Sequence, residues 1–257
     1  MSNRAVYATQ PRPLQEQLSV LLKSGPKADA MGEILAVIVP DANLLAGGEV
    51  AAYVYRLLEG SSYDTVVLVA PSHTGEFGRI SICSVDEYRT ALGNLSVNDR
   101  LRNELCDEDD DIFLDNRGHF HTEGVDVQLP FLQSVLASKF DIVPIVMGDE
   151  SPEFCRELGH AIGEVMFNRR VLVVASANII EAAEGALDTF VESFERGDIS
   201  RLMTLMNSET VRVEGKGPIV VAVLAAVQNR ANYFKMLSIR APQSGTPGYI
   251  AAVLCRA

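Results

Sequence analysis

Five short apolar runs, each rich in valine, isoleucine or leucine, recur along the chain. Continuous apolar runs are typical of strands that are buried on both faces of a sheet, whereas half-buried strands alternate apolar and polar residues. The runs predict strands at Ile34–Pro40, Thr65–Ala70, Ile142–Met147, Val171–Ser176 and Tyr249–Leu254.

Segments with apolar residues at helical spacing lie between these runs. They predict helices at Val50–Glu59, Val127–Leu136 and Glu153–Met166, within the stretch Ala183–Met206, and at Pro218–Gln228. Alternating strands and helices indicate an α/β fold, with a central, mostly parallel or mixed sheet flanked by helices. Since no repeat and no linker rich in Pro, Gly or Ser divides the chain, we expect residues 1–257 to form a single domain.

Net charge and hydropathy indicate which classes of binding partner and which location are expected. The 257 residues carry a formal net charge of −12, which argues against nucleic acid and anionic membranes as partners and suits cationic ligands or metal ions. No apolar run approaches the ~18 residues that a membrane-spanning helix needs. The first residues lead into no apolar signal segment, so we expect a cytoplasmic protein.

The four cysteines indicate no metal or disulfide framework. Cys83, Cys106, Cys155 and Cys255 are widely spaced and form no CxxC pair. The simplest interpretation of Cys83 and Cys255, which lie in apolar runs, is that they are small buried apolar residues.

Polar side chains that follow the predicted strands are the candidates for chemistry, because ligands bind beyond the carboxyl ends of strands in open parallel sheets. Asp41 follows the first run, His73 the second, and Asn178 and Glu181 the fourth. Carboxylate, imidazole and amide groups serve in metal sites and in acid–base catalysis. Turn formation is the alternative role for Asp41 and Asn178, since loops are polar in any case.

Other polar segments have both a structural and a functional interpretation. His119 and His121 are two residues apart and could form two metal ligands or lie in an exposed loop, whereas His160 is expected to be structural. Asp107–Asp111 is expected to be a solvated loop, with cation binding as the alternative. The stretch 215–218 favours a helix start over an anion site.

Several segments together resemble the Memo family, which is similar in fold to the class III extradiol ring-cleaving dioxygenases. The resemblance runs from about Arg4 to the C-terminus, and its most specific piece is VDVQLPFLQ at Val125–Gln133. The segments that carry it are Ile38–Leu58, Val66–Gly78, Arg89–Asn98, Glu123–Gln133, Val171–Ile179 and Gly248–Ala252. The resemblance implies a Memo-like α/β fold and a metal site.

The chain departs from the family pattern at most of the six positions that the resemblance assigns to that site. The second-strand histidine is kept as His73, but carboxylates replace the family's histidines and cysteine elsewhere, and an amide replaces an aspartate. The changed positions are Asp41, Glu123 and Glu181 for histidines, Glu214 for a cysteine and Asn178 for an aspartate.

Two functions are compatible with these replacements. We interpret the pattern as a degenerate metal site in a non-catalytic protein that binds a small molecule or a protein partner. The alternative is a metal-dependent enzyme acting on a small molecule, with a site rebuilt around His73 for a divalent cation such as Mg, Mn, Ca or Fe, because carboxylates suit hard cations. Extradiol oxygen chemistry is not expected, since its ferrous site uses two histidines and a carboxylate.

Overall fold

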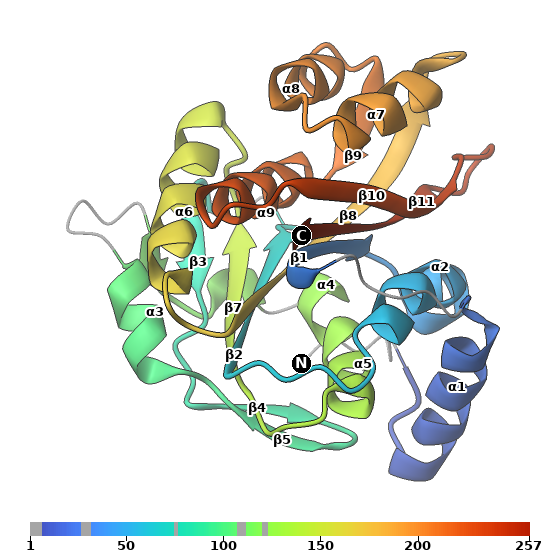
Figure 1. Cartoon of the computed structure of the whole chain (residues 1–257). Helices are drawn as coiled ribbons and strands as arrows, with labels where there is room; N and C mark the ends of the chain where they lie inside the picture. The colour runs from blue at the N-terminus through green and yellow to red at the C-terminus, as the bar shows by residue number, and fades with distance from the viewer. Residues whose placement is uncertain (1–6, 27–31, 75–76, 107–111, 120–122) are drawn as a thin grey trace.

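The computed structural model describes residues 7–26, 32–74, 77–106, 112–119 and 123–257 (Figure 1). The helices of this part are α1 (Pro11–Ser24), α2 (Leu44–Leu57), α3 (Asp99–Leu105), the 3-10 turn η1 (Arg117–His119), α4 (Glu123–Asp126), α5 (Gln128–Val135), α6 (Pro152–Met166), α7 (Ala186–Glu195), α8 (Ile199–Asn207) and α9 (Lys216–Gln228). The strands are β1 (Glu33–Pro40), β2 (Thr65–Pro71), β3 (Ile80–Ile82), β4 (Glu87–Thr90), β5 (Gly93–Ser96), β6 (Ile112–Leu114), β7 (Asp141–Met147), β8 (Val171–Ala182), β9 (Val211–Glu214), β10 (Tyr233–Arg240) and β11 (Gly248–Arg256).

A mixed sheet runs through the centre of the molecule. Its strands follow the order β10-β11-β1-β8-β2-β7-β3-β6, and β9 pairs with the extended end of β8. The central strands β1, β8, β2 and β7 are parallel, whereas β11 and β3 flank them in antiparallel pairings. This arrangement confirms the predicted α/β fold with a mixed central sheet.

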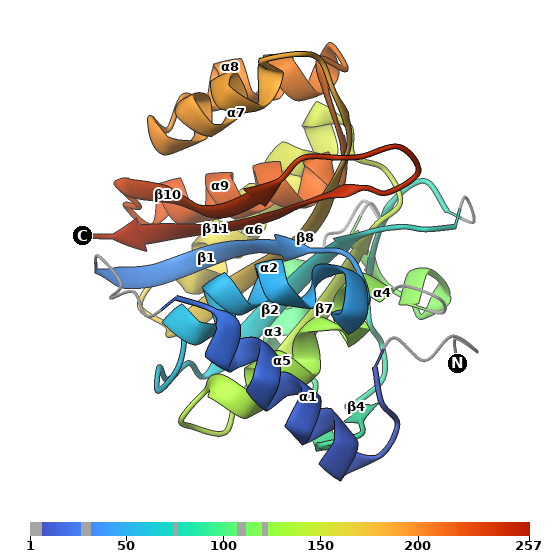
Figure 2. The same ribbon diagram turned by 90° about the vertical axis from the view of Figure 1, so that its right-hand side faces the viewer.

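Helices cover both faces of the sheet, so that the strands are buried on both sides (Figures 1 and 2). Side chains along β2 alternate between two apolar cores: Val67 and Val69 join the core under α6 and α9, while Val66, Leu68 and Ala70 join the core under α1, α2 and α5. Burial on both faces is the reason that the strand sequences are continuously apolar.

The five predicted strands are all present, but one helical stretch is divided. A break between α7 and α8 interrupts the helical pattern of Ala183–Met206 at Gly197, whose φ is +66°. The left-handed backbone that glycine adopts at low cost ends the first helix, and Asp198 then caps the second by accepting from the N–H of Arg201. The remaining strands were not predicted because they are short or carry polar residues on an exposed face.

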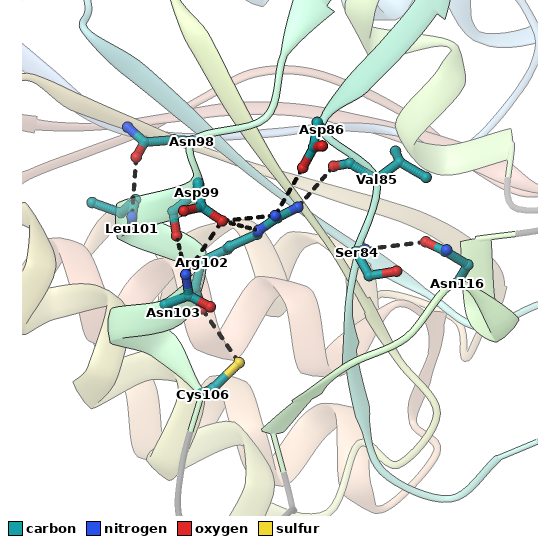
Figure 3. Close-up of polar contacts among 10 residues, drawn as sticks. All are labelled: Ser84, Val85, Asp86, Asn98, Asp99, Leu101, Arg102, Asn103, Cys106 and Asn116. Atoms are coloured by element: carbon teal, nitrogen blue, oxygen red, sulfur yellow. Dashed lines mark hydrogen bonds and ion pairs between the residues drawn. The ribbon is translucent and has the colours of Figure 1, made fainter.

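A buried arginine fastens the β4–β5 hairpin region to α3 (Figure 3). The guanidinium of Arg102 donates to Asp99 Oδ1 at 2.7 Å, to Asp86 Oδ1 at 3.0 Å and to the carbonyl of Val85 at 2.8 Å. Only 9% of its side chain is exposed, so these bonds replace the water that burial removes. We assign Arg102 a structural role.

None of the helices in the described ranges is both long enough and apolar enough to cross a membrane.

Candidate functional site

The strand order brings three candidate residues to one edge of the sheet. β8 lies between β1 and β2 and runs parallel to both, with Pro40 paired to Ala177 and Val69 paired to Ala175. The carboxyl ends of these three strands therefore adjoin one another. Asp41 follows β1 directly, Asn178 lies within β8, and His73 comes two residues after the end of β2.

Asn178 holds the backbone of Asp41 through two hydrogen bonds. The N–H of Asp41 donates to Asn178 Oδ1 at 3.1 Å, and Asn178 Nδ2 donates to the carbonyl oxygen of Asp41 at 2.5 Å. Both residues are buried. An ionised aspartate could accept the first bond but could not donate the second, so this geometry requires the amide.

His73 lies between two carboxylates. Its Nε2 is 2.8 Å from Asp41 Oδ2, and its Nδ1 is 4.0 Å from Glu214 Oε1. Asn178 Nδ2 also approaches Glu214 Oε2 at 3.4 Å, because Asn178 and Glu214 are paired across β8 and β9. The side chain of Asp41 is fully buried, whereas 28% of that of His73 and 39% of that of Glu214 are exposed. The cluster thus extends from the interior to the surface.

Gln128 of the VDVQLPFLQ segment binds the end of β1 through its side-chain amide. Its Nε2 donates to the carbonyl of Pro40 at 2.9 Å, and its Oε1 accepts from the hydroxyl of Tyr55 at 2.7 Å. Tyr55 in turn stacks on Phe131 of the same segment, with ring centroids 4.5 Å apart. Because Gln128 is completely buried, these bonds fix the chain immediately before Asp41.

Glu150 is a further acidic residue of this region that the sequence analysis did not identify. Its Oε2 accepts from the N–H of Gly217 at 2.9 Å, in the first turn of α9. Burial raises the pKa of Glu150, the Gly217 bond opposes this shift, and the charges of Glu214 and Asp41 raise the pKa further. Its position after β7 was the available signal, since β7 is another parallel strand whose carboxyl end meets the same edge.

Two of the six predicted site residues, Glu181 and Glu123, have no described contact with His73. A bulge in β8 between Ile179 and Glu181 leaves Glu181 beside Arg212, with Arg212 Nη1 3.7 Å from Glu181 Oε2. With 72% of its side chain exposed, Glu181 points into solvent rather than toward His73. Glu123 begins α4, and its side chain lies outside the described part of the structure.

Gly124 brings α4 close to the cluster. Its carbonyl accepts from Ser176 Oγ at 2.8 Å, and a Cβ atom at this position would lie only 3.0 Å from Asp41 Oδ1. The missing side chain therefore lets the helix pack against the buried carboxylate.

Two of the remaining histidines, His119 and His160, contact other parts of the fold. His119 Nε2 is 3.1 Å from the carbonyl oxygen of Ser81, and burial lowers the pKa of His119 to about 4. The ring of His160 contacts Gln228 of α9 at 3.0 Å, linking two helices as a structural residue would. His121 and Asp107–Asp111 lie outside the described residues.

The described residues do not fit a metal site of the kind that the family resemblance implies. Among them, no group of three or more His, Cys, Asp and Glu side chains is arranged to hold a metal ion. His73 directs Nε2 at Asp41, and the Asn178 amide directs its donor atom at Asp41 and Glu214. His73, Asp41 Oδ2, Asn178 and Glu214 contact one another, whereas Asp41 Oδ1 has no hydrogen-bond partner among the described residues.

Comparison with known proteins assigns the family. The model of the family described as "Memo-like protein" matches residues 4–249. The chain belongs to the Memo family. A MEMO1 family protein of Saccharolobus islandicus is 31% identical over 233 residues, which cover 85% of this Memo-family chain and 82% of the relative. A MEMO1 family protein of Sulfolobus acidocaldarius is 30% identical over 198 residues, covering 74% of this chain and 69% of the relative.

A solved structure supports the fold of this Memo-family member. The crystal structure of an uncharacterized protein from Escherichia coli K12 is similar, with a TM-score of 0.51 and 14% sequence identity, covering 86% of this chain and 99% of that one. Within the fold, four of the six family site positions contact one another, namely Asp41, His73, Asn178 and Glu214.

Proposed function

We propose that this Memo-family protein is a non-catalytic ligand-binding or interaction protein with a degenerate metal site. The observation that supports the proposal is the 2.8 Å contact between His73 Nε2 and Asp41 Oδ2. A metal ligand must be deprotonated and must direct its lone pair at the metal. Here Nε2 of His73 is directed at a buried carboxylate and Nδ1 faces Glu214 Oε1 at 4.0 Å, so that both ring nitrogens have carboxylate neighbours.

Both ring nitrogens of His73 face carboxylates. Nε2 is 2.8 Å from Asp41 Oδ2, and Nδ1 is 4.0 Å from Glu214 Oε1. A cation that used His73 as a ligand would have to displace one of these two contacts.

One observation favours the alternative function, a metal-dependent enzyme acting on a small molecule. Asp41 Oδ1 is buried and has no hydrogen-bond partner among the described residues. Unpartnered buried carboxylate oxygens are costly, and a divalent cation would compensate the charge. Glu150 adds a third carboxylate whose pKa is raised, first by burial and then by Glu214 and Asp41, against the opposing Gly217 bond.

Metal binding separates the two functions. Purified protein would be analysed for bound metal. Its melting temperature would be measured with and without millimolar Mg, Mn or Ca, and with and without ferrous iron under anaerobic conditions. We expect no stoichiometric metal and no saturable rise in melting temperature. Glu214→Gln and Glu181→Gln form a matched pair, because both remove one carboxylate from a family site position but only Glu214 contacts His73.

A saturable rise in the wild type that Glu214→Gln abolishes and Glu181→Gln preserves would overturn the proposal in favour of the enzyme. A rise kept equally in both variants would indicate binding to the general acidic surface, which leaves His73 without a metal and agrees with a degenerate site. A rise lost in both variants would show that both carboxylates contribute to one cation site and would also overturn the proposal.

A further inference from the structure

A cavity of about 1430 Å³ lies at the end of the sheet opposite to His73. Residues of α1, α5 and β5 and the last turn of α2 line it, and so does Asp141, the first residue of β7. β2 and β7 run in parallel from the Thr65–Asp141 pair to the Pro71–Met147 pair, so the cavity and His73 are separated by the length of a seven-residue strand, ~20 Å. In Figure 2, α1, α5 and β4 gather in this lower part of the molecule.

Three cations without carboxylate partners in the described part of the chain line this cavity. Lys23, Arg56 and Lys139 line it, and none of them has an ion-pair partner within the described ranges. This is unexpected in a chain with 34 acidic and 22 basic residues, where carboxylates are in excess. Glu59 and Asp141 also line the cavity but do not form ion pairs with these cations, so basic groups exceed acidic ones there by one.

Arg56 is the residue of this group that is held in place. Its Nη1 donates to the carbonyl of Leu22 at 2.6 Å, which anchors the guanidinium between α2 and α1. Its Nε is buried and has no hydrogen-bond partner in the described part of the chain. A guanidinium stays charged at every physiological pH and presents donors in a planar fork that matches carboxylate and phosphate groups.

Helix dipoles account for only part of this pattern. Lys23 and Arg56 lie in the last turns of α1 and α2, where cations interact favourably with the helix C-terminus. Lys139 lies outside any helix, between α5 and β7, and the unpartnered Arg56 Nε is not explained by a dipole. The dipoles therefore do not account for the presence of Lys139 in the same cavity lining.

We propose that this cavity is a second binding site, which takes a small organic anion bearing a phosphate or carboxylate group. The anion would supply the counter-charge for Lys23, Arg56 and Lys139. Leucine side chains, including the buried Leu18 and Leu95, also line the cavity and would contact the apolar part of the ligand. Most of the other lining residues are polar, which suits a ligand with several charged or hydroxyl groups.

Isothermal titration calorimetry of the full chain with inorganic phosphate, pyrophosphate and citrate tests the proposal. We expect saturable binding of at least one of these anions, and the comparison of phosphate or pyrophosphate with citrate distinguishes the two anionic groups. The variant Arg56→Gln/Lys139→Gln is expected to bind at least tenfold more weakly. The control Arg156→Gln/Arg201→Gln changes the net charge equally at exposed positions away from the cavity and is expected to keep the wild-type affinity.

The single variant Lys139→Gln tests the cavity without changing Arg56, whose loss could destabilise the packing of α1. Lys139 is exposed, so we expect this variant to keep the fold and to bind the anion more weakly than the wild type. The variant His73→Ala is expected to bind the anion as the wild type does, so that this test is independent of the site around His73. The proposal is overturned by absence of saturable binding for all three anions, by equal weakening in the control, or by loss of binding in His73→Ala.

Discussion

Asn178→Asp restores the family residue at this position, and we expect it to destabilise this protein. The substitution removes the donor that bonds to the carbonyl of Asp41 at 2.5 Å, leaving a buried acceptor facing a carboxylate oxygen. An unsatisfied buried polar group costs about 1–3 kcal/mol. The new charge would also face Glu214 Oε2 across the 3.4 Å that now separates this oxygen from the amide nitrogen.

Two ionised carboxylates at that separation would repel each other by roughly 5 kcal/mol at an effective dielectric constant of 20. Protonation or movement of the partly exposed Glu214 relieves part of this energy. We therefore expect a total loss of about 2–5 kcal/mol in the free energy of unfolding near pH 8. Because the folded state raises the pKa of the introduced carboxyl, the loss should shrink as the pH falls through the folded-state pKa toward the unfolded-state pKa of about 3.9, below which the carboxyl is protonated in both states.

Urea denaturation of the wild type and the variant at pH 8, 6 and 4.5 measures this effect. Asn94→Asp is the matched control, because Asn94 Nδ2 donates to Glu87 Oε2 at 3.1 Å in an exposed hairpin. We expect the control to change stability by no more than about 0.5 kcal/mol. Equal stability of Asn178→Asp and wild type at pH 8 would refute the assigned role of the amide.

Three further substitutions test other parts of the structure. Arg102→Leu should lower the free energy of unfolding by about 2 kcal/mol in urea denaturation, because it removes charge-assisted bonds from a buried group; an unchanged midpoint would show that these bonds contribute nothing. Gly124→Ala should cost about 1–3 kcal/mol, since its Cβ would lie 3.0 Å from Asp41 Oδ1, and an unaltered melting temperature would contradict this packing. Glu150→Gln keeps an acceptor for the N–H of Gly217 but removes a carboxylate. Burial and neighbouring charges raise the pKa of this carboxylate, although the Gly217 bond acts in the opposite direction. A carboxylate with a raised pKa costs stability above its unfolded-state pKa, so calorimetry should find the variant more stable than wild type at pH 8 and the two alike near pH 3; the opposite order at pH 8 would contradict the assignment.

The sequence alone determined the α/β class and the central strands. A continuous apolar run such as Val171–Ser176 can be shielded from water only when helices cover both faces of its sheet, and periodic apolar positions supplied those helices. It also placed Asp41 and His73 after the ends of their strands, whereas Asn178, predicted to follow a strand that ends at Ser176, lies within β8 because β8 continues to Ala182 and pairs there with β9. It did not predict short or half-polar strands such as β4 and β10, whose exposed faces remove the apolar signal.

Tertiary structure decided which of these polar residues meet. The order β1-β8-β2 brings Asp41 into contact with both Asn178 and His73, and strand order depends on long-range packing that a local pattern does not encode. The bulge in β8 directs Glu181 into solvent, although its sequence position matches the family site as closely as that of Glu214. One additional residue in a ladder changes the direction of the side chains that follow it, and that displacement is a property of the paired strands rather than of either segment alone.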